Sequence, residues 1–159
     1  MPLGGRDDSW SLSAGGWDHG LVVDEFDPER WLRFVRFPAF TRDWERFGLD
    51  GEDLRLLELE ILENPTRAPV VQGTGGLRKV RYAGRKSAKG KSGAYRVCYV
   101  VYPEFGTIVL ATVFGKNEKA DLSSADRRAV AAVVEAFRAE LRVEFLRGKE
   151  RRGEHGQDG

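Results

Sequence analysis

The fold is decided by three stretches of sequence: LRKVRY (Leu77–Tyr82), YRVCYVVY (Tyr95–Tyr102) and TIVLATVF (Thr107–Phe114). Each is short and rich in β-branched or aromatic residues, which is typical of β-strands. A long basic hairpin loop at residues 84–93 separates the first stretch from the second, and a tight turn at residues 103–106 separates the second from the third. Consecutive strands joined by such turns pair in an antiparallel sheet.

Two short helices are predicted ahead of these strands, over residues 39–47 and 50–62. Apolar residues recur there at the three- and four-residue spacing of one helix face. These residues are Phe40, Trp44, Phe47, Leu54, Leu57 and Ile61. Gly48 ends the first helix. Asn64 ends the second, because a residue that precedes a proline avoids the helical region.

A third helix is predicted after the last strand, from Ser123 or Ser124 to about Leu146. Serine is a good N-cap, and Asp126 lies in the first turn, where the helix dipole favours negative charge. Residues 31–37 predict one further strand and residues 70–71 a short one. The predicted fold class is therefore α+β: two N-terminal helices and a C-terminal helix packed on a mainly antiparallel sheet of four to five strands. We expect the helices to cover one sheet face and leave the other open to solvent or a ligand.

A single domain fits the length of 159 residues. We expect it to span residues 29–146, with disordered tails at residues 1–28, which are acidic and Gly-rich, and at residues 147–159. The one cysteine, Cys98, excludes an internal disulfide and is interpreted as a buried apolar side chain. No apolar run approaches the ~20 residues that span a bilayer, so the sequence predicts a soluble, cytoplasmic protein without membrane contact.

The net charge of +1 hides an uneven distribution. Residues 65–103 contain nine basic residues and no acidic ones, whereas residues 1–30 contain seven acidic residues and two basic ones. A basic segment free of acids favours a polyanion such as nucleic acid. The alternative interpretation is a solvated basic hairpin without a partner.

Several kinds of chemistry are excluded by the residue types. Both histidines, His19 and His155, lie in the predicted tails, which argues against a histidine general base. The carboxylates do not cluster, so neither a metal nor another cofactor is expected. A phosphate-binding P-loop needs four residues between its first glycine and Gly-Lys-Ser, but five separate Gly84 from Gly90 here, and a β-rich segment follows where a helix is required.

A site built from Lys and Arg can still cleave RNA without a metal. The 2′-hydroxyl of RNA is an internal nucleophile, so a protein needs only to align it, neutralise the phosphate and assist proton transfer. The planar guanidinium of arginine suits the phosphate in the transition state. DNA lacks this hydroxyl, so the chemistry selects RNA.

Four segments in order resemble the RelE/HigB toxin superfamily, and most closely its HigB-like branch. They are Gly73-Thr-Gly-Gly-Leu-Arg-Lys-Val-Arg, Gly90-Lys-Ser-Gly, Tyr95-Arg-Val-Cys-Tyr and Gly115-Lys-Asn-Glu-Lys-Ala-Asp-Leu-Ser. The resemblance runs from about Trp31 to Leu141. It implies the toxin of a bacterial type II toxin–antitoxin system, an endoribonuclease that cuts mRNA in the ribosomal A site and so inhibits translation. The implied partners are a cognate antitoxin, the ribosome and mRNA.

The resemblance also implies the site residues. The implied catalytic residues are Lys79, Arg81, Arg96 and Lys116, and the implied RNA-binding residues are Arg78, Lys89, Lys91 and Lys119. Lys79 and Arg81 are two positions apart on one strand and therefore share a sheet face. Structural roles are the alternative for each: exposed strand positions, an ion pair of Arg96 with a carboxylate, or capping of the last helix by its preceding loop.

Two features depart from the family pattern. Asn117 lies inside the loop after the last strand, and no tyrosine follows Tyr102, so the general acid and base are not assigned. The acidic N-terminal extension is either a disordered tail, which includes the possibility of a misassigned start, or an inhibitor folded over the basic segment.

Two further functions remain open at this stage. One is a non-catalytic toxin of the same fold that binds a protein such as DNA gyrase. The other is a regulator that binds RNA or the ribosome without cleavage.

Overall fold

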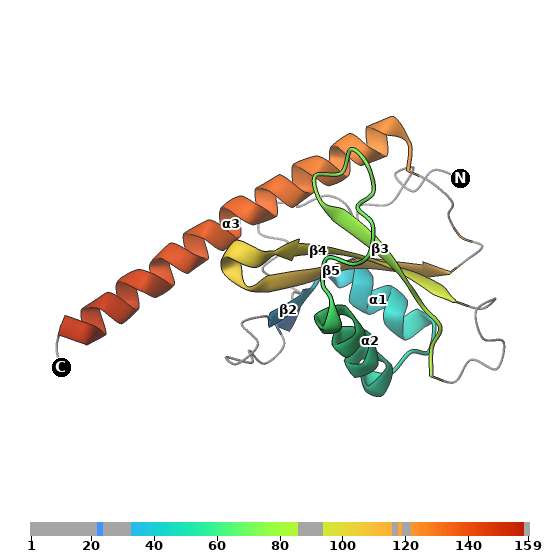
Figure 1. The fold of residues 1–159 in the computed structure, drawn as a ribbon, viewed down its shortest axis with the longest axis horizontal. Coiled ribbons are helices and arrows are strands. Elements are labelled where there is room, and N and C mark those ends of the chain that lie inside the picture. Colours follow the sequence, from blue (N-terminus) through green and yellow to red (C-terminus); the bar gives the residue numbers. More distant parts are fainter. Residues whose placement is uncertain (1–21, 24–32, 86–93, 116–117, 119–121, 158–159) are drawn as a thin grey trace.

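The computed structural model describes residues 22–23, 33–85, 94–115, 118 and 122–157, and side chains at 33–85, 94–115, 118 and 122–151. Helices and strands both contribute, which gives the expected α+β class (Figure 1). In chain order the elements are β1 (Val22–Val23), β2 (Arg33–Arg36), α1 (Pro38–Arg46), α2 (Gly51–Glu63), β3 (Leu77–Tyr82), β4 (Tyr95–Tyr102), a 3-10 turn (Pro103–Phe105), β5 (Thr107–Gly115) and α3 (Ser124–Gln157).

The strands form one mixed sheet in the order β1-β2-β5-β4-β3. Within it, β3–β4, β4–β5 and β1–β2 are antiparallel pairs of strands that follow one another in the chain. However, β2 lies parallel to β5, with Arg33 opposite Thr107 and Arg36 opposite Leu110. The chain leaves β2 through two helices and two strands before it returns beside it, so no hairpin dictates the direction of that pair. Residues 70–71 do not form a strand, and only Val70 makes an isolated bridge to Arg78.

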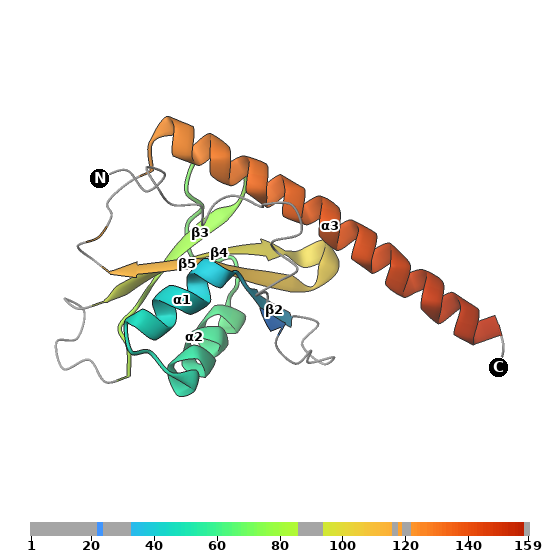
Figure 2. The ribbon, with the colours of Figure 1, turned by 180° about the vertical axis from the view of Figure 1, so that it is seen from behind.

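The helices cover both faces of the sheet, so the expectation of one open face is wrong (Figures 1 and 2). On one face, α1 and α2 pack on the sheet. The helix residues buried there are Phe40, Trp44, Leu57 and Ile61, and the strand residues beneath them are Phe34, Val97, Tyr99 and Leu110. On the other face, α3 packs on the sheet. It buries Val130, Val134 and Phe137, and the strand residues beneath it are Val35, Leu77, Val100 and Val109. The reason lies in β4 and β5, where consecutive residues are buried rather than alternate ones. A near-continuous apolar run is typical of a strand covered on both sides.

A buried carboxylate joins α2 to the end of β3. Asp50 and Asp53 form a capping box at the start of α2, in which each side chain accepts a hydrogen bond from the other residue's backbone N–H. Asp53, only 1% exposed, also accepts hydrogen bonds from the Tyr82 hydroxyl and from the Arg85 backbone N–H, both at 2.8 Å. This network fixes the position at which the chain leaves β3 towards residues 86–93.

The last helix is longer than predicted and has two parts. Its buried side chains end at Leu141, but the helix continues to Gln157 and projects from the body (Figures 1 and 2). Residues 147–157 are therefore helical, although the sequence predicted a disordered tail there. Leu146 in the projecting part is 51% exposed.

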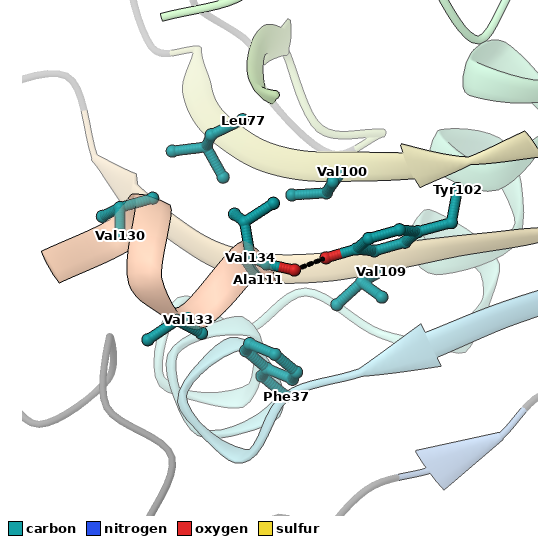
Figure 3. Close-up of a pocket in the computed structure, with 9 residues that line it drawn as sticks. All are labelled: Phe37, Leu77, Val100, Tyr102, Val109, Ala111, Val130, Val133 and Val134. Carbon is teal, nitrogen blue, oxygen red and sulfur yellow. Dashed lines mark hydrogen bonds between the residues drawn. The ribbon is translucent and has the colours of Figure 1, made fainter. Parts of the chain in front are cut away.

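The packed part of α3 is held by a polar anchor as well as by apolar contacts. The Tyr102 hydroxyl donates a hydrogen bond of 2.8 Å to the Val134 carbonyl (Figure 3). The nine residues around this bond line a cavity of about 10 Å³, and apart from the tyrosine hydroxyl they are apolar. A space of this size holds at most one water molecule, so the gap is a feature of packing rather than a ligand site.

Candidate nucleic-acid interface

Three of the predicted catalytic residues meet on the α3 side of the sheet. Along β3, Lys79 and Arg81 alternate with Val80 and so share the face of Leu77, which packs under α3. The register places Arg81 directly opposite Arg96 of β4, and Lys79 opposite Cys98. We call Lys79, Arg81 and Arg96 the cationic face.

The cationic face lies where α3 leaves the sheet uncovered. Leu77, at the start of β3, is buried under the first turns of α3, but β3 then runs away from the helix (Figures 1 and 2). Arg81 is accordingly exposed, and Lys79 and Arg96 are partly exposed. Neither sheet face is fully open. On the face covered by α3, only the end that carries Arg81 is open to solvent in the described part of the chain.

The turn before β3 brings the start of this strand, but not its end, under α3. Thr74 is fully buried, and its hydroxyl donates to the Val71 carbonyl and accepts from the Leu77 N–H. Gly75 has φ +76°, and a Cβ at this position would lie 3.8 Å from Ala131 of α3. The Gly73–Gly76 motif therefore brings the backbone close to α3 at the start of β3, and it does so as a structural turn rather than as a phosphate loop.

The strands that carry the cationic face add no negative charge to it. The three strands β3, β4 and β5 contain no Asp or Glu. Within the described residues, Lys79 and Arg96 form no salt bridge, and the Arg96 guanidinium donates only a long hydrogen bond of 3.4 Å to the Ala94 carbonyl. Four arginines outside the cationic face are paired with carboxylates: Arg33–Glu144, Arg46–Glu118, Arg85–Asp50 and Arg138–Glu104.

Arg78 does not join the cationic face. It points to the opposite side of β3 and donates hydrogen bonds to the carbonyls of Thr66 and Ala68, at 2.9 and 2.6 Å. These contacts hold the connection between α2 and β3 in place. The structure thus gives this predicted RNA-binding residue a structural role.

Four predicted residues lie outside the described part of the chain. They are Lys89, Lys91, Lys116 and Lys119. The flanks of their segments are described: Arg85 pairs with Asp50 at 2.6 Å, and the Gly115 N–H donates to the Glu118 carboxylate at 2.7 Å. His19 and the N-terminal extension also lie outside the described residues, as does the side chain of His155.

The buried thiol and tyrosines do not supply reactive groups to this face. Burial raises the pKa of the Cys98 thiol to about 12, although the nearby Lys79 ammonium acts in the opposite direction. Cys98 is therefore an inert core residue, as expected. Burial likewise raises the pKa of Tyr82, Tyr99 and Tyr102. Their hydroxyls donate to Asp53, to the Pro65 carbonyl and to the Val134 carbonyl.

One aromatic residue was missed by the sequence reasoning. Phe114 of β5 lies opposite Arg96 and is partly exposed on the same face. Its two-residue alternation with Thr112 was visible in the sequence, but its cross-strand partner depends on the register, which contains a bulge between Cys98 and Tyr99.

The chain matches no model of a known protein family. Among the described residues, no three His, Cys, Asp or Glu side chains are grouped so that they could hold a metal ion. The described helices include none with the length and apolar character needed to cross a bilayer.

Proposed function

We propose that this protein is the toxin of a type II toxin–antitoxin system, a ribosome-dependent and metal-independent endoribonuclease that cleaves mRNA. The observation that carries the proposal is the cationic face, because Lys79, Arg81 and Arg96 converge from adjacent strands on an open sheet end that no acid on these strands neutralises. Such a surface attracts the phosphates of RNA.

The arrangement suits attack by the 2′-hydroxyl on the adjacent phosphate. Arg81 and Arg96 are neighbours across the strands, so their guanidinium groups can bind the same phosphate and stabilise the charge that develops on it. The bond from phosphorus to the 5′-oxygen breaks as the 2′-oxygen bonds to phosphorus, and Lys79 is the ammonium group that donates a proton to the leaving oxygen. The 2′-hydroxyl proton passes to solvent, since β3, β4 and β5 carry no histidine or carboxylate.

The element order supports a RelE-like arrangement. The chain runs from a strand through two helices to three antiparallel strands and a final helix, as the resemblance implies. The motif Gly73-Thr-Gly-Gly-Leu-Arg-Lys ends on the face where the predicted catalytic residues gather. The partners that follow from this proposal are an antitoxin, the ribosome and mRNA.

A second function, RNA or ribosome binding without cleavage, uses the same cations. It is favoured by one observation. The hydroxyls of Tyr82, Tyr99 and Tyr102 are engaged in the fold, and Tyr95 packs on Phe47 on the other side of the sheet, so none of the four tyrosines serves the cationic face as a general acid or base. Primer extension separates the two functions, because only a nuclease produces cuts in the mRNA.

The deciding experiment is primer extension on an mRNA in a translating extract, with the full chain added. We expect cuts within codons only when ribosomes translate, and none on naked mRNA. Arg96→Ala should lower the cleavage rate at least about 100-fold, the loss typical of one transition-state donor, while ribosome binding is largely kept. The control is Arg55→Ala, an exposed arginine of α2 on the other side of the sheet, which should cleave normally. A fall in translation without any cut would favour the binding function.

A further inference from the structure

Arg81, Arg96 and Phe114 form a row across three strands. Arg81 of β3 is paired with Arg96 of β4, and Arg96 is paired in turn with Phe114 of β5. Side chains opposite each other in adjacent strands lie on the same face and in contact distance. The row therefore places Phe114 next to Arg96 and one strand further from Arg81.

Phe114 differs in exposure from the aromatic residues buried between the sheet and α3. Tyr102 and Phe137 are almost completely buried under α3, at 1% and 2% exposure. Phe114 packs only against the margin of the same core, at the uncovered end of the sheet, and is partly exposed. Its ring is thus held in position by the core while part of it faces the surface of the cationic face.

We propose that Phe114 is a stacking platform for one unpaired base of the bound RNA, while Arg81 and Arg96 bind the phosphates next to it. An aromatic ring beside cations is the combination by which proteins bind single strands, because every base has a π-face and every nucleotide a phosphate. A base inside a duplex has both faces covered, so the platform selects unpaired RNA. This inference rests on the proposed function for its ligand, and it adds a positioning residue that the sequence motifs do not assign.

The test compares two short oligoribonucleotides of equal length, one of uridines and one of base-free ribose phosphates. Both present the same phosphates, but only the first can stack. Affinities of the full-length protein for each are measured by fluorescence anisotropy at low ionic strength. The variants are Phe114→Leu, Phe114→Tyr, which retains an aromatic ring, and Phe145→Leu, which makes the same change at a phenylalanine 38% exposed on the distant part of α3.

We expect Phe114→Leu to weaken binding of the uridine oligomer about five- to hundredfold, the loss that corresponds to one stacked base. Binding of the base-free oligomer should not change, and Phe114→Tyr and Phe145→Leu should bind both oligomers as the wild type does. Thermal melting of each variant shows whether it is folded. If the leucine variant is not, the affinities of the wild type for the two oligomers still test the inference.

Three results would overturn the inference: equal affinity of Phe114→Leu and wild type for uridines, equal affinity of the wild type for the two oligomers, or no binding of either oligomer. Failure of the proposed function is a separate result, namely intact mRNA in the translating extract. If Phe114 stacks a base but the mRNA stays uncut, the stacking proposal stands and the nuclease proposal fails.

Discussion

Asp53 and Lys79 illustrate two opposite uses of charge in this protein. Asp53 is buried, and its carboxylate accepts hydrogen bonds from the Tyr82 hydroxyl and from two backbone N–H groups. Lys79 is partly exposed and has no carboxylate partner within the described residues. The first charge stabilises the fold, whereas the second is available to a ligand.

Replacement of Asp53 by alanine should destabilise the protein by about 2–4 kcal/mol. About 1 kcal/mol comes from the lost hydrogen bond between the Asp50 N–H and the Asp53 carboxylate, which is half of the capping box. The rest comes from the buried Tyr82 hydroxyl left without its acceptor. Urea denaturation measures the free energy of unfolding. The control is Glu52→Ala, the neighbouring carboxylate, whose side chain is 75% exposed and which should change stability by less than about 0.5 kcal/mol. Equal effects of the two substitutions would contradict the role given to Asp53.

Single residues were predicted well where strand alternation alone decides their position. The shared face of Lys79 and Arg81 follows from their two-residue spacing and is confirmed. The position of Arg96 opposite Arg81 depends on strand register, which the sequence does not give. The hydrogen bonds of Arg78 to the Thr66 and Ala68 carbonyls depend on the path of a loop, which the sequence does not give either.

Among the elements, α3 combines a packed part and a projecting part. Val130, Phe137 and Leu141 bury the first part against the sheet, and Arg138 pairs with Glu104 beyond β4. Past Phe145, which packs on Phe105, the helix leaves the body. Only the packed part contributes tertiary contacts to the described fold.

Removal of residues 150–159 should therefore change the free energy of unfolding by less than about 0.5 kcal/mol, as for surface changes. Phe137→Ala should cost about 3–5 kcal/mol, because it deletes a buried ring and leaves a cavity. Urea denaturation of both variants provides the comparison. A truncated chain as unstable as Phe137→Ala would show that the projecting part packs on the body.

The elements themselves were largely predicted. The bounds of β3 and β4 agree with the sequence pattern. Those of α1 and α2 differ by one residue at each end, and β5 ends one residue later than predicted. These elements carry strong periodicity and clear stop signals. The C-terminal part of α3 was missed because residues 147–157 contain three glycines and few apolar residues, so no amphipathic stripe marks them as helix.

At the scale of the whole molecule, the sheet separates two apolar cores and leaves one end of one face open. That open end is also where the chain concentrates basic residues on β3 and β4. The α+β class followed from the order of predicted elements. The placement of helices on both faces did not, because apolar runs in β4 and β5 predict strands without saying which elements cover each face.

The central claim, that the cationic face cleaves RNA by 2′-hydroxyl attack, is tested most directly by one substitution in the substrate. An mRNA is prepared with a single 2′-deoxynucleotide on the 5′ side of a cut mapped in the translating extract, and cleavage is measured again by primer extension. We expect the cut at that position to disappear while cuts elsewhere in the same mRNA remain. Unchanged cleavage at the deoxynucleotide would contradict the account, because the nucleophile would then be something other than the neighbouring hydroxyl.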